Sequence, residues 1–128
     1  MRGREAIESY LLKLDLPYEE IGDGTWMINA GQGERNLVIR LAEPVAVFRC
    51  KVMDVPPGRR EELFRTLLEL NATDLLHGAY GLEGNTVVLS GALELENLDF
   101  NEFQATVDDM LLALSNHAPK LETFMRPA

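Results

Sequence analysis

Histidine and cysteine, which are the usual ligands of transition metals, are scarce in this sequence. His77 and His117 are the only histidines, and neither has a second histidine or cysteine three to five positions away, as local metal pairs do. Cys50 is the only cysteine, and it lies far from both histidines in the sequence. The sequence therefore predicts no metal site.

The usual contexts of nucleophilic and phosphate chemistry are also missing. A catalytic thiol must be exposed and have a lowered pKa, whereas the alternating segment FRCKV predicts that Cys50 is a small buried hydrophobe in a strand. The serines, Ser9, Ser90 and Ser115, have no nucleophile-elbow context. Gly31-Gln32-Gly33 forms a predicted loop but lacks the third glycine and the lysine of a phosphate loop. We therefore expect no cofactor.

Two carboxylate pairs could in principle share protons in acid–base catalysis. These pairs are Glu94 with Glu96 and Asp108 with Asp109. A charged strand end accounts for the first pair, and a solvated helix face accounts for the second. Together with the absent motifs, this interpretation predicts that the protein is not an enzyme.

Length and composition predict one cytoplasmic domain. A chain of 128 residues is the size of a single domain, here residues 1–128, and can bury a sufficient core without metal or disulfide. The single cysteine cannot form an internal disulfide and fits a reducing compartment. Near the N-terminus, Glu5 and Glu8 interrupt any apolar signal segment, and no run approaches membrane-spanning length. We expect no membrane partner.

The net charge of −9 is unevenly distributed. Residues 66–119 contain no Lys or Arg but nine acids, while the rest of the chain has twelve charges of each sign. Such a surface repels nucleic acid and would attract basic segments, although it could also serve only to keep the protein soluble. We therefore predict a basic or amphipathic protein segment as partner and exclude nucleic acid.

The elements that carry these residues can be predicted from periodicity. Helices are expected at 4–14, in the segment RREELFRTLLELN, and from about 102 onwards, where Pro119 predicts a kink or break near His117 and Ala118. In the central helix, Leu63, Leu67 and Leu70 share one broad apolar arc with other residues: Phe64, Leu68, Asn71 and Leu75. We interpret Asn71 as a C-terminal cap or turn of this helix.

Strands account for most of the remaining chain. Residues 25–30, 36–41 and 45–55 alternate between polar and apolar, and short loops make them an antiparallel succession. Residues 18–21 are expected to be extended. Strands at 79–82 and 86–95 flank Gly84-Asn85, which suits a tight hairpin, and Gly91 predicts a bulge or a close backbone approach. Trp26 is expected in the core.

The spaced succession of several segments resembles the YbjN domain family. The segments are GTWMINA, LVIRLAEPVAVFRCKV, LLELN, HGAYGL, VVLSGALEL and LDFNEF, and the resemblance covers about residues 5–115. The YbjN family is in turn similar in fold to the CesT/Tir-type chaperones of type III secretion. The resemblance implies an α+β domain of order α-β-β-β-α-β-β-α, in which helices pack on a twisted antiparallel sheet of about five strands. It also implies protein binding, often a homodimer, and no catalytic residues.

The leading functional hypothesis is a non-enzymatic, chaperone-like domain that binds proteins or peptides as a homodimer. Its dimer or client interface is predicted at Leu70, Leu75, Leu76 and Tyr80, because these side chains exceed what a small core readily hides. One alternative is a sensory or regulatory domain that binds a small molecule between sheet and helices, in a pocket lined by Trp26, Phe48 and Met53. Another is a purely structural oligomer without a client.

Overall fold

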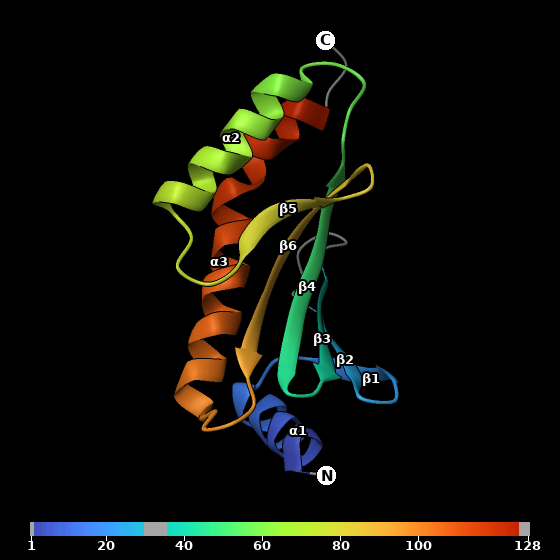
Figure 1. Ribbon diagram of the computed structural model, residues 1–128, viewed down its shortest axis with the longest axis vertical. Coiled ribbons are helices and arrows are strands. Elements are labelled where there is room, and N and C mark those ends of the chain that lie inside the picture. Colours follow the sequence, from blue (N-terminus) through green and yellow to red (C-terminus); the bar gives the residue numbers. More distant parts are fainter. Residues whose placement is uncertain (1, 30–35, 126–128) are drawn as a thin grey trace.

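The computed structural model describes residues 2–29 and 36–125, which form three helices and one antiparallel sheet (Figure 1). The elements are α1 Arg2–Leu14, β1 Tyr18–Gly22, β2 Thr25–Asn29, β3 Asn36–Ala42, β4 Val45–Asp54, α2 Arg60–Thr73, β5 Ala79–Glu83, β6 Thr86–Glu94 and α3 Phe100–Met125. The α+β class and the antiparallel sheet are confirmed. The predicted loop at Gly31-Gln32-Gly33 lies outside the described residues.

The sheet has six strands instead of about five, in the order β1-β2-β3-β4-β6-β5. The additional strand is β1, which was expected only as an extended segment. It pairs with β2 across the tight turn at Asp23 and Gly24, and its register shifts between Glu20 and Gly22. A strand with this irregularity and mostly exposed residues gives little alternation for a sequence pattern to detect.

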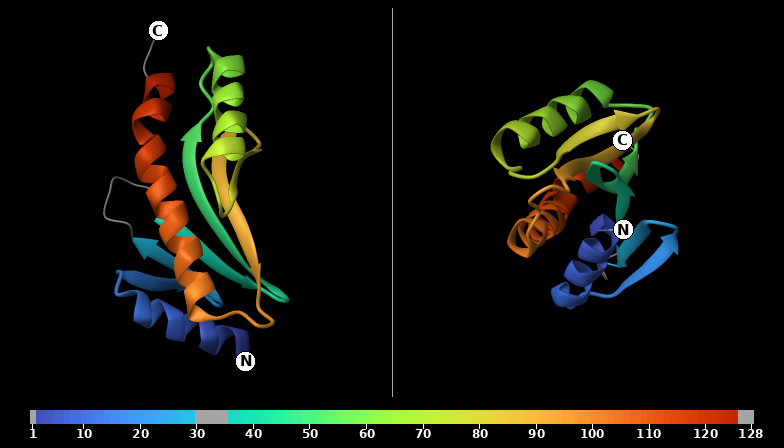
Figure 2. Two further views of the ribbon diagram at one scale, coloured as in Figure 1. Left: turned by 90° about the vertical axis from the view of Figure 1, so that its left-hand side faces the viewer. Right: turned by 60° about the horizontal axis from the view of Figure 1, so that its bottom comes forward.

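The helices of the described residues lie on one side of the sheet (Figure 2). α3 runs along the sheet, α1 lies across one end of it, and α2 lies beside α3 near the β5 edge. The inward side chains of the strands meet these helices in one core, in which Trp26, Phe48 and Phe103 are among the largest fully buried residues. Trp26 is therefore a core residue, as predicted.

β4 shows why one face of the sheet is buried and the other is not. Ala46, Phe48, Cys50 and Val52 are buried, whereas the alternate residues between them are half-buried or exposed. This period of two is the one expected from the sequence, and it confirms Cys50 as a buried side chain. The opposite face of β4 carries Arg49 and Lys51 among valines.

Asn71 is not the cap of α2, because the helix continues to Thr73 and its C-cap is Asp74. The Asn71 side chain instead bonds the backbone of Tyr80 in β5 twice. The Tyr80 N–H donates to Asn71 Oδ1 at 2.7 Å, and Asn71 Nδ2 donates to the Tyr80 carbonyl at 3.1 Å. These are the bonds that a neighbouring strand would make, so Asn71 occupies part of the open edge of β5.

A tight turn and a close backbone approach fix the β5–β6 hairpin. Gly84, with φ of 60°, takes the first central position of the turn, and Asn85 keeps a negative φ, as in a type II′ hairpin. A Cβ on Gly91 would lie 3.1 Å from the Cα of Gly78, so the joint between α2 and β5 touches β6 directly. The close backbone approach predicted at Gly91 is confirmed.

The break predicted at Pro119 does not occur. α3 runs without interruption from Phe100 to Met125, with Pro119 inside it. Pro119 and Ser115, whose carbonyl loses its helical N–H partner, both lie on the exposed face, where water can satisfy that carbonyl. On the other face, His117, Leu121 and Phe124 are buried and hold the helix on both sides of the proline.

Candidate functional site

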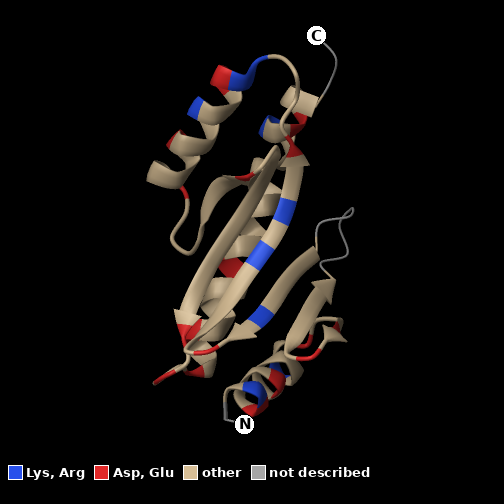
Figure 3. Ribbon diagram, turned by 45° about the vertical axis from the view of Figure 1, so that its right-hand side comes forward, with Lys and Arg blue, Asp and Glu red and all other residues tan. Residues whose placement is uncertain are grey.

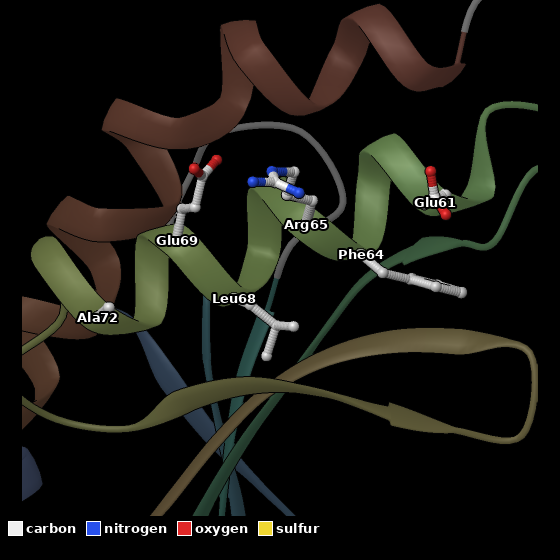
Figure 4. A pocket seen from close by; sticks show the side chains of 6 residues that line it. All are labelled: Glu61, Phe64, Arg65, Leu68, Glu69 and Ala72. Atoms are coloured by element: carbon white, nitrogen blue, oxygen red, sulfur yellow. The ribbon is translucent and has the colours of Figure 1, made fainter.

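The outer face of α2 carries an open groove beside exposed apolar side chains (Figure 4). Leu63, Leu67 and Leu70 point into the core, while Phe64 and Leu68, each one residue further along, are rotated away from it by about 100°. Leu68 is 68% exposed. The broad apolar arc expected to face the core is therefore two stripes: the first is buried, and in the second Phe64 packs half-buried against the core while Leu68 is exposed.

Charged residues flank the exposed stripe. Glu61, Arg65 and Glu69 follow one another at intervals of four residues, and with Phe64, Leu68 and Ala72 they line the groove. Phe64 and Leu68 point toward the β5–β6 hairpin, whereas Arg65 and Glu69 point away from it (Figure 4). Such a surface offers an apolar ridge next to a mixed-charge ridge, which suits contact with another protein chain.

The predicted interface residues lie at different depths. Leu70 and Tyr80 are each only 6% exposed and belong to the core, and Leu75 packs against the core as a half-buried side chain. Leu76, in contrast, is 84% exposed in the joint between α2 and β5. Of the four, Leu76 is therefore the one whose side chain is mostly accessible.

The residues predicted to line a small-molecule pocket are all core residues. Trp26, Phe48 and Met53 are buried within the same hydrophobic cluster. Phe48 packs against Phe103 of α3, with ring centroids 5.7 Å apart. These side chains hold the sheet against the helices.

A buried histidine connects three elements. His117 of α3 is 5% exposed; its Nδ1 lies 2.7 Å from the Tyr80 hydroxyl of β5, and its Nε2 lies 3.1 Å from Asp74 Oδ2 at the end of α2. Asp74 also accepts a bond from the Thr73 hydroxyl at 2.9 Å. This series of hydrogen bonds resembles a catalytic relay. Its terminal group, however, is the hydroxyl of Tyr80, a buried side chain that is bonded to the imidazole. Its evident role is to join α2, β5 and α3.

A second acid organises the joint after α2. Asp109 Oδ2 of α3 accepts the backbone N–H of His77 at 2.8 Å and that of Leu76 at 3.3 Å. His77 Nδ1 lies 3.5 Å from the same oxygen without hydrogen-bond geometry. The predicted pair Asp108 and Asp109 is therefore divided, since Asp108 is exposed and Asp109 is half-buried in this contact.

Several acids of residues 66–119 have partners within the chain. Glu83 binds Arg49, whose hydrogen bonds lower the pKa of the Glu83 carboxyl and raise that of the guanidinium. Asp99 accepts the N–H of Glu102 at 2.8 Å and so caps α3. The exposed acids that remain include Glu94, Glu96, Glu102 and Asp108. The surface available to a basic partner is therefore smaller than the sequence count indicates.

Residues 2–29 and 36–125 contain neither a metal cluster nor a membrane-spanning helix. In that part of the chain, no group of three His, Cys, Asp or Glu side chains is placed to hold a metal ion. None of its helices combines the length and the hydrophobicity needed to cross a membrane.

The sequence matches the model of one protein family over almost its whole length. That family is CesT_Tir_1, and the match covers residues 2–127. No curated protein matches the sequence significantly.

Solved structures with the same fold include secretion chaperones and YbjN. A chain of the heterodimeric ExoU–SpcU complex, from the type III secretion system of Pseudomonas aeruginosa, matches with a TM-score of 0.71 and 20% identity, covering 88% of this chain and 95% of that one. YbjN from E. coli gives 0.69 and 14% identity, covering 92% of both. The Yersinia pestis type III secretion chaperone SycH, solved with a fragment of YscM2, gives 0.64 and 13%, covering 89% and 98%.

Proposed function

The chain belongs to the CesT_Tir_1 family, and from this premise we propose that it is a non-enzymatic, chaperone-like domain that binds protein segments and acts as a homodimer. Structures of the same fold support a protein partner, since SycH was solved with a fragment of YscM2 and ExoU–SpcU is a heterodimer. The observation that carries the proposal is the exposed apolar stripe of α2. In that stripe Phe64 is half-buried, and Leu68, in the middle of the helix, remains 68% exposed.

We assign the contact between two copies to this face of α2. A two-fold contact brings the same patch of both copies together, so the patch must complement itself. The apolar ridge of Phe64 and Leu68 can pack against its counterpart, and Arg65 of one copy can reach Glu61 or Glu69 of the other. Leu76, in the joint that follows this helix, is a further exposed apolar side chain.

The assignment is tested by Leu68→Glu. Burial of a carboxylate in an apolar contact without a partner is costly, so this variant should sediment as a monomer at concentrations where the wild-type protein is a dimer. Leu12→Glu is the matched control, because Leu12 is 71% exposed on α1, away from α2. It should sediment as the wild type does.

Contrary results have distinct meanings. Wild-type protein that stays monomeric at tens of micromolar would refute the homodimer. Equal weakening of the dimer by both variants would refute the assignment to α2.

The client is proposed to be a basic or amphipathic protein segment. The exposed acids Glu94, Glu96 and Glu102 lie at the end of β6 and the start of α3, where they can attract basic side chains. Co-purification of clients from the native host, repeated at raised salt, tests how much these acids contribute to client binding. Clients should be lost progressively as salt increases. A stable dimer that recovers no client would instead favour a purely structural oligomer.

A further inference from the structure

The face of α2 that lines the groove carries two ridges side by side (Figure 4). In each ridge, the residues follow one another at intervals of four positions. The apolar ridge of Phe64 and Leu68 continues to Ala72, and the charged ridge beside it consists of Glu61, Arg65 and Glu69. Leu68 points toward the β5–β6 hairpin, whereas Arg65 and Glu69 point away from it. The two ridges therefore occupy opposite sides of this face.

The position of the ridges determines the direction in which two copies can pack. If the two-fold axis ran along the helices, the helices would be parallel, and the apolar ridge of each copy would face the charged ridge of the other. If the axis runs across the helices, they are antiparallel, and like ridges face each other. Only the antiparallel contact removes Leu68, which is 68% exposed, from water without desolvating a charged group opposite it. The face therefore favours antiparallel helices.

The charges then select the register of the antiparallel helices. Arg65 opposite Glu69 of the partner copy places the two-fold axis at position 67. The middle of the apolar ridge is Leu68, one residue or about 1.5 Å further along the helix. One axis thus serves both ridges. It places Leu68 on its counterpart and Phe64 beside Ala72 of the partner copy, whose small side chain leaves room for the ring.

The alternative pairing, of Arg65 with Glu61 of the partner copy, does not fit the apolar ridge. It would move the axis to position 63, four residues toward the start of the helix. Leu68 would then lie opposite Gly58, which precedes Arg60, the first residue of α2. No apolar side chain of the helix would cover Leu68 in that arrangement. The register with Glu69 is therefore the one that satisfies both ridges.

The three charges of this ridge are free to make contacts between copies. Glu61, Arg65 and Glu69 are exposed, and among residues 2–29 and 36–125 their side chains make no hydrogen bond or ion pair. Arg59, in contrast, bonds Glu62 at 3.0 Å within the chain. A solvated helix face would also leave charges without partners. It does not require opposite charges at the two positions that the axis of the apolar ridge exchanges.

We propose that the α2 helices of the homodimer run antiparallel and that Arg65 of each copy pairs with Glu69 of the partner copy. The inference rests on the proposed homodimer and adds its direction, its register and the residue pair that determines which surface is recognised. Two-fold symmetry makes this pair occur twice in each dimer. Charge pairs at the rim of an apolar contact contribute mainly to specificity, because a wrong register or a wrong partner brings like charges together. The pair therefore selects a second copy of this chain over other apolar surfaces.

The test measures the dissociation constant of the dimer by sedimentation equilibrium at low salt, where surface charges are least screened. Arg65→Glu and Glu69→Arg should each weaken the dimer about tenfold, because each dimer then contains two like-charge contacts. A mixture of the two variants in equal amounts should associate about as tightly as the wild type, since opposite charges meet at both contacts. Within each variant chain, positions 65 and 69 carry like charges. Recovery in the mixture therefore requires contact between copies.

Glu61→Arg is the matched control. It changes the net charge of −9 by the same amount as Glu69→Arg, but in this register position 61 faces the neutral Thr73 of the partner copy. Glu61→Arg should therefore not weaken the dimer. Both substitutions lower the general repulsion between two acidic copies, so a dimer that is weakened only by Glu69→Arg reports the pairing with Arg65.

Three results would overturn the proposal: equal weakening by Glu61→Arg and Glu69→Arg, a mixture that associates no more tightly than either variant alone, or wild-type affinity in both Arg65→Glu and Glu69→Arg. Each of these results is obtained while the wild-type protein still forms a dimer. Failure of the proposed homodimer is a different outcome, which wild-type protein that stays monomeric would show.

Discussion

Asn71 illustrates how one polar side chain can act in place of a strand. Its amide bonds both the N–H and the carbonyl of Tyr80, at 2.7 and 3.1 Å, on the side of β5 that faces away from β6. From the sequence, an asparagine within an apolar arc near a helix end indicates a cap. The actual role depends on β5 returning beside α2, which is a tertiary contact that local periodicity does not contain.

The same limit applies to His117, Tyr80 and Asp74. In the sequence, His117 is 43 positions from Asp74 and 37 positions from Tyr80. No local spacing rule joins residues so distant. Cys50 and Trp26, in contrast, lie in strands whose alternation directly indicates burial, and the structure confirms both.

Asp74 should make stability depend on pH at acidic values. Hydrogen bonds from Thr73 and then His117 lower the pKa of its carboxyl below the ordinary value of 3.8. A lowered folded-state pKa means that the contribution is present above 3.8 and is lost as the pH falls through the folded-state pKa. Asp74→Asn should therefore reduce stability more at neutral pH than near pH 3, as measured by urea unfolding at each pH.

Asp108→Asn is the control for this prediction, because Asp108 is exposed on α3 and has no hydrogen bond among the described residues. Its effect on unfolding should be small at both pH values. A loss for Asp74→Asn that is equal at neutral and acidic pH would contradict the interpretation.

At the scale of elements, α2 was predicted correctly as a helix but incorrectly in its buried width. Leu63, Leu67 and Leu70 are core and Phe64 packs half-buried against it, whereas Leu68 is exposed. The available signal was the breadth of the arc, since one side of a surface helix rarely buries two adjacent stripes. The second stripe is the part that a partner can contact.

α3 provides a direct test of how a proline is tolerated. Pro119 lies on the exposed face of a helix that is buried on the other side, so packing outweighs the missing hydrogen bond. Pro119→Ala restores the N–H that can bond the Ser115 carbonyl. We expect stabilisation of about 1–2 kcal/mol in urea unfolding, after the greater freedom of the unfolded chain is subtracted.

Pro57→Ala is the matched control, since Pro57 is exposed and precedes α2. Because Pro57→Ala restores no helical hydrogen bond, the free energy of unfolding of this variant should be unchanged or slightly lower. If Pro119→Ala is no more stable than Pro57→Ala, the account of α3 is wrong.

At the scale of the whole molecule, the antiparallel order of β2, β3 and β4 followed from short loops, which cannot contain crossovers. The pairing of β4 with β6 did not, because α2 and β5 lie between these strands in the sequence. The sixth strand was missed because β1 is irregular and mostly exposed. The charge count of the sequence also gave an incomplete picture. Glu83, Asp99 and Asp109 serve contacts within the chain. The open face of the sheet carries basic residues on β3 and β4 (Figure 3) together with the acids Glu19 and Glu94.

The two sides of this molecule differ in character. The helical side presents the apolar stripe of α2, and the open sheet presents Arg40 among valines. Between them, the core is occupied by large side chains such as Trp26 and Phe48. This arrangement favours a protein that works through its surfaces.

The central claim is that the outer face of α2 contacts a second copy of the chain. It is tested most directly by recording the amide resonances of the wild-type protein across a dilution series. The account predicts concentration-dependent shifts at Phe64, Leu68 and Ala72, together with Leu76, and none around Leu12 on α1. Resonances of α2 that stay constant while those of another surface shift would contradict it.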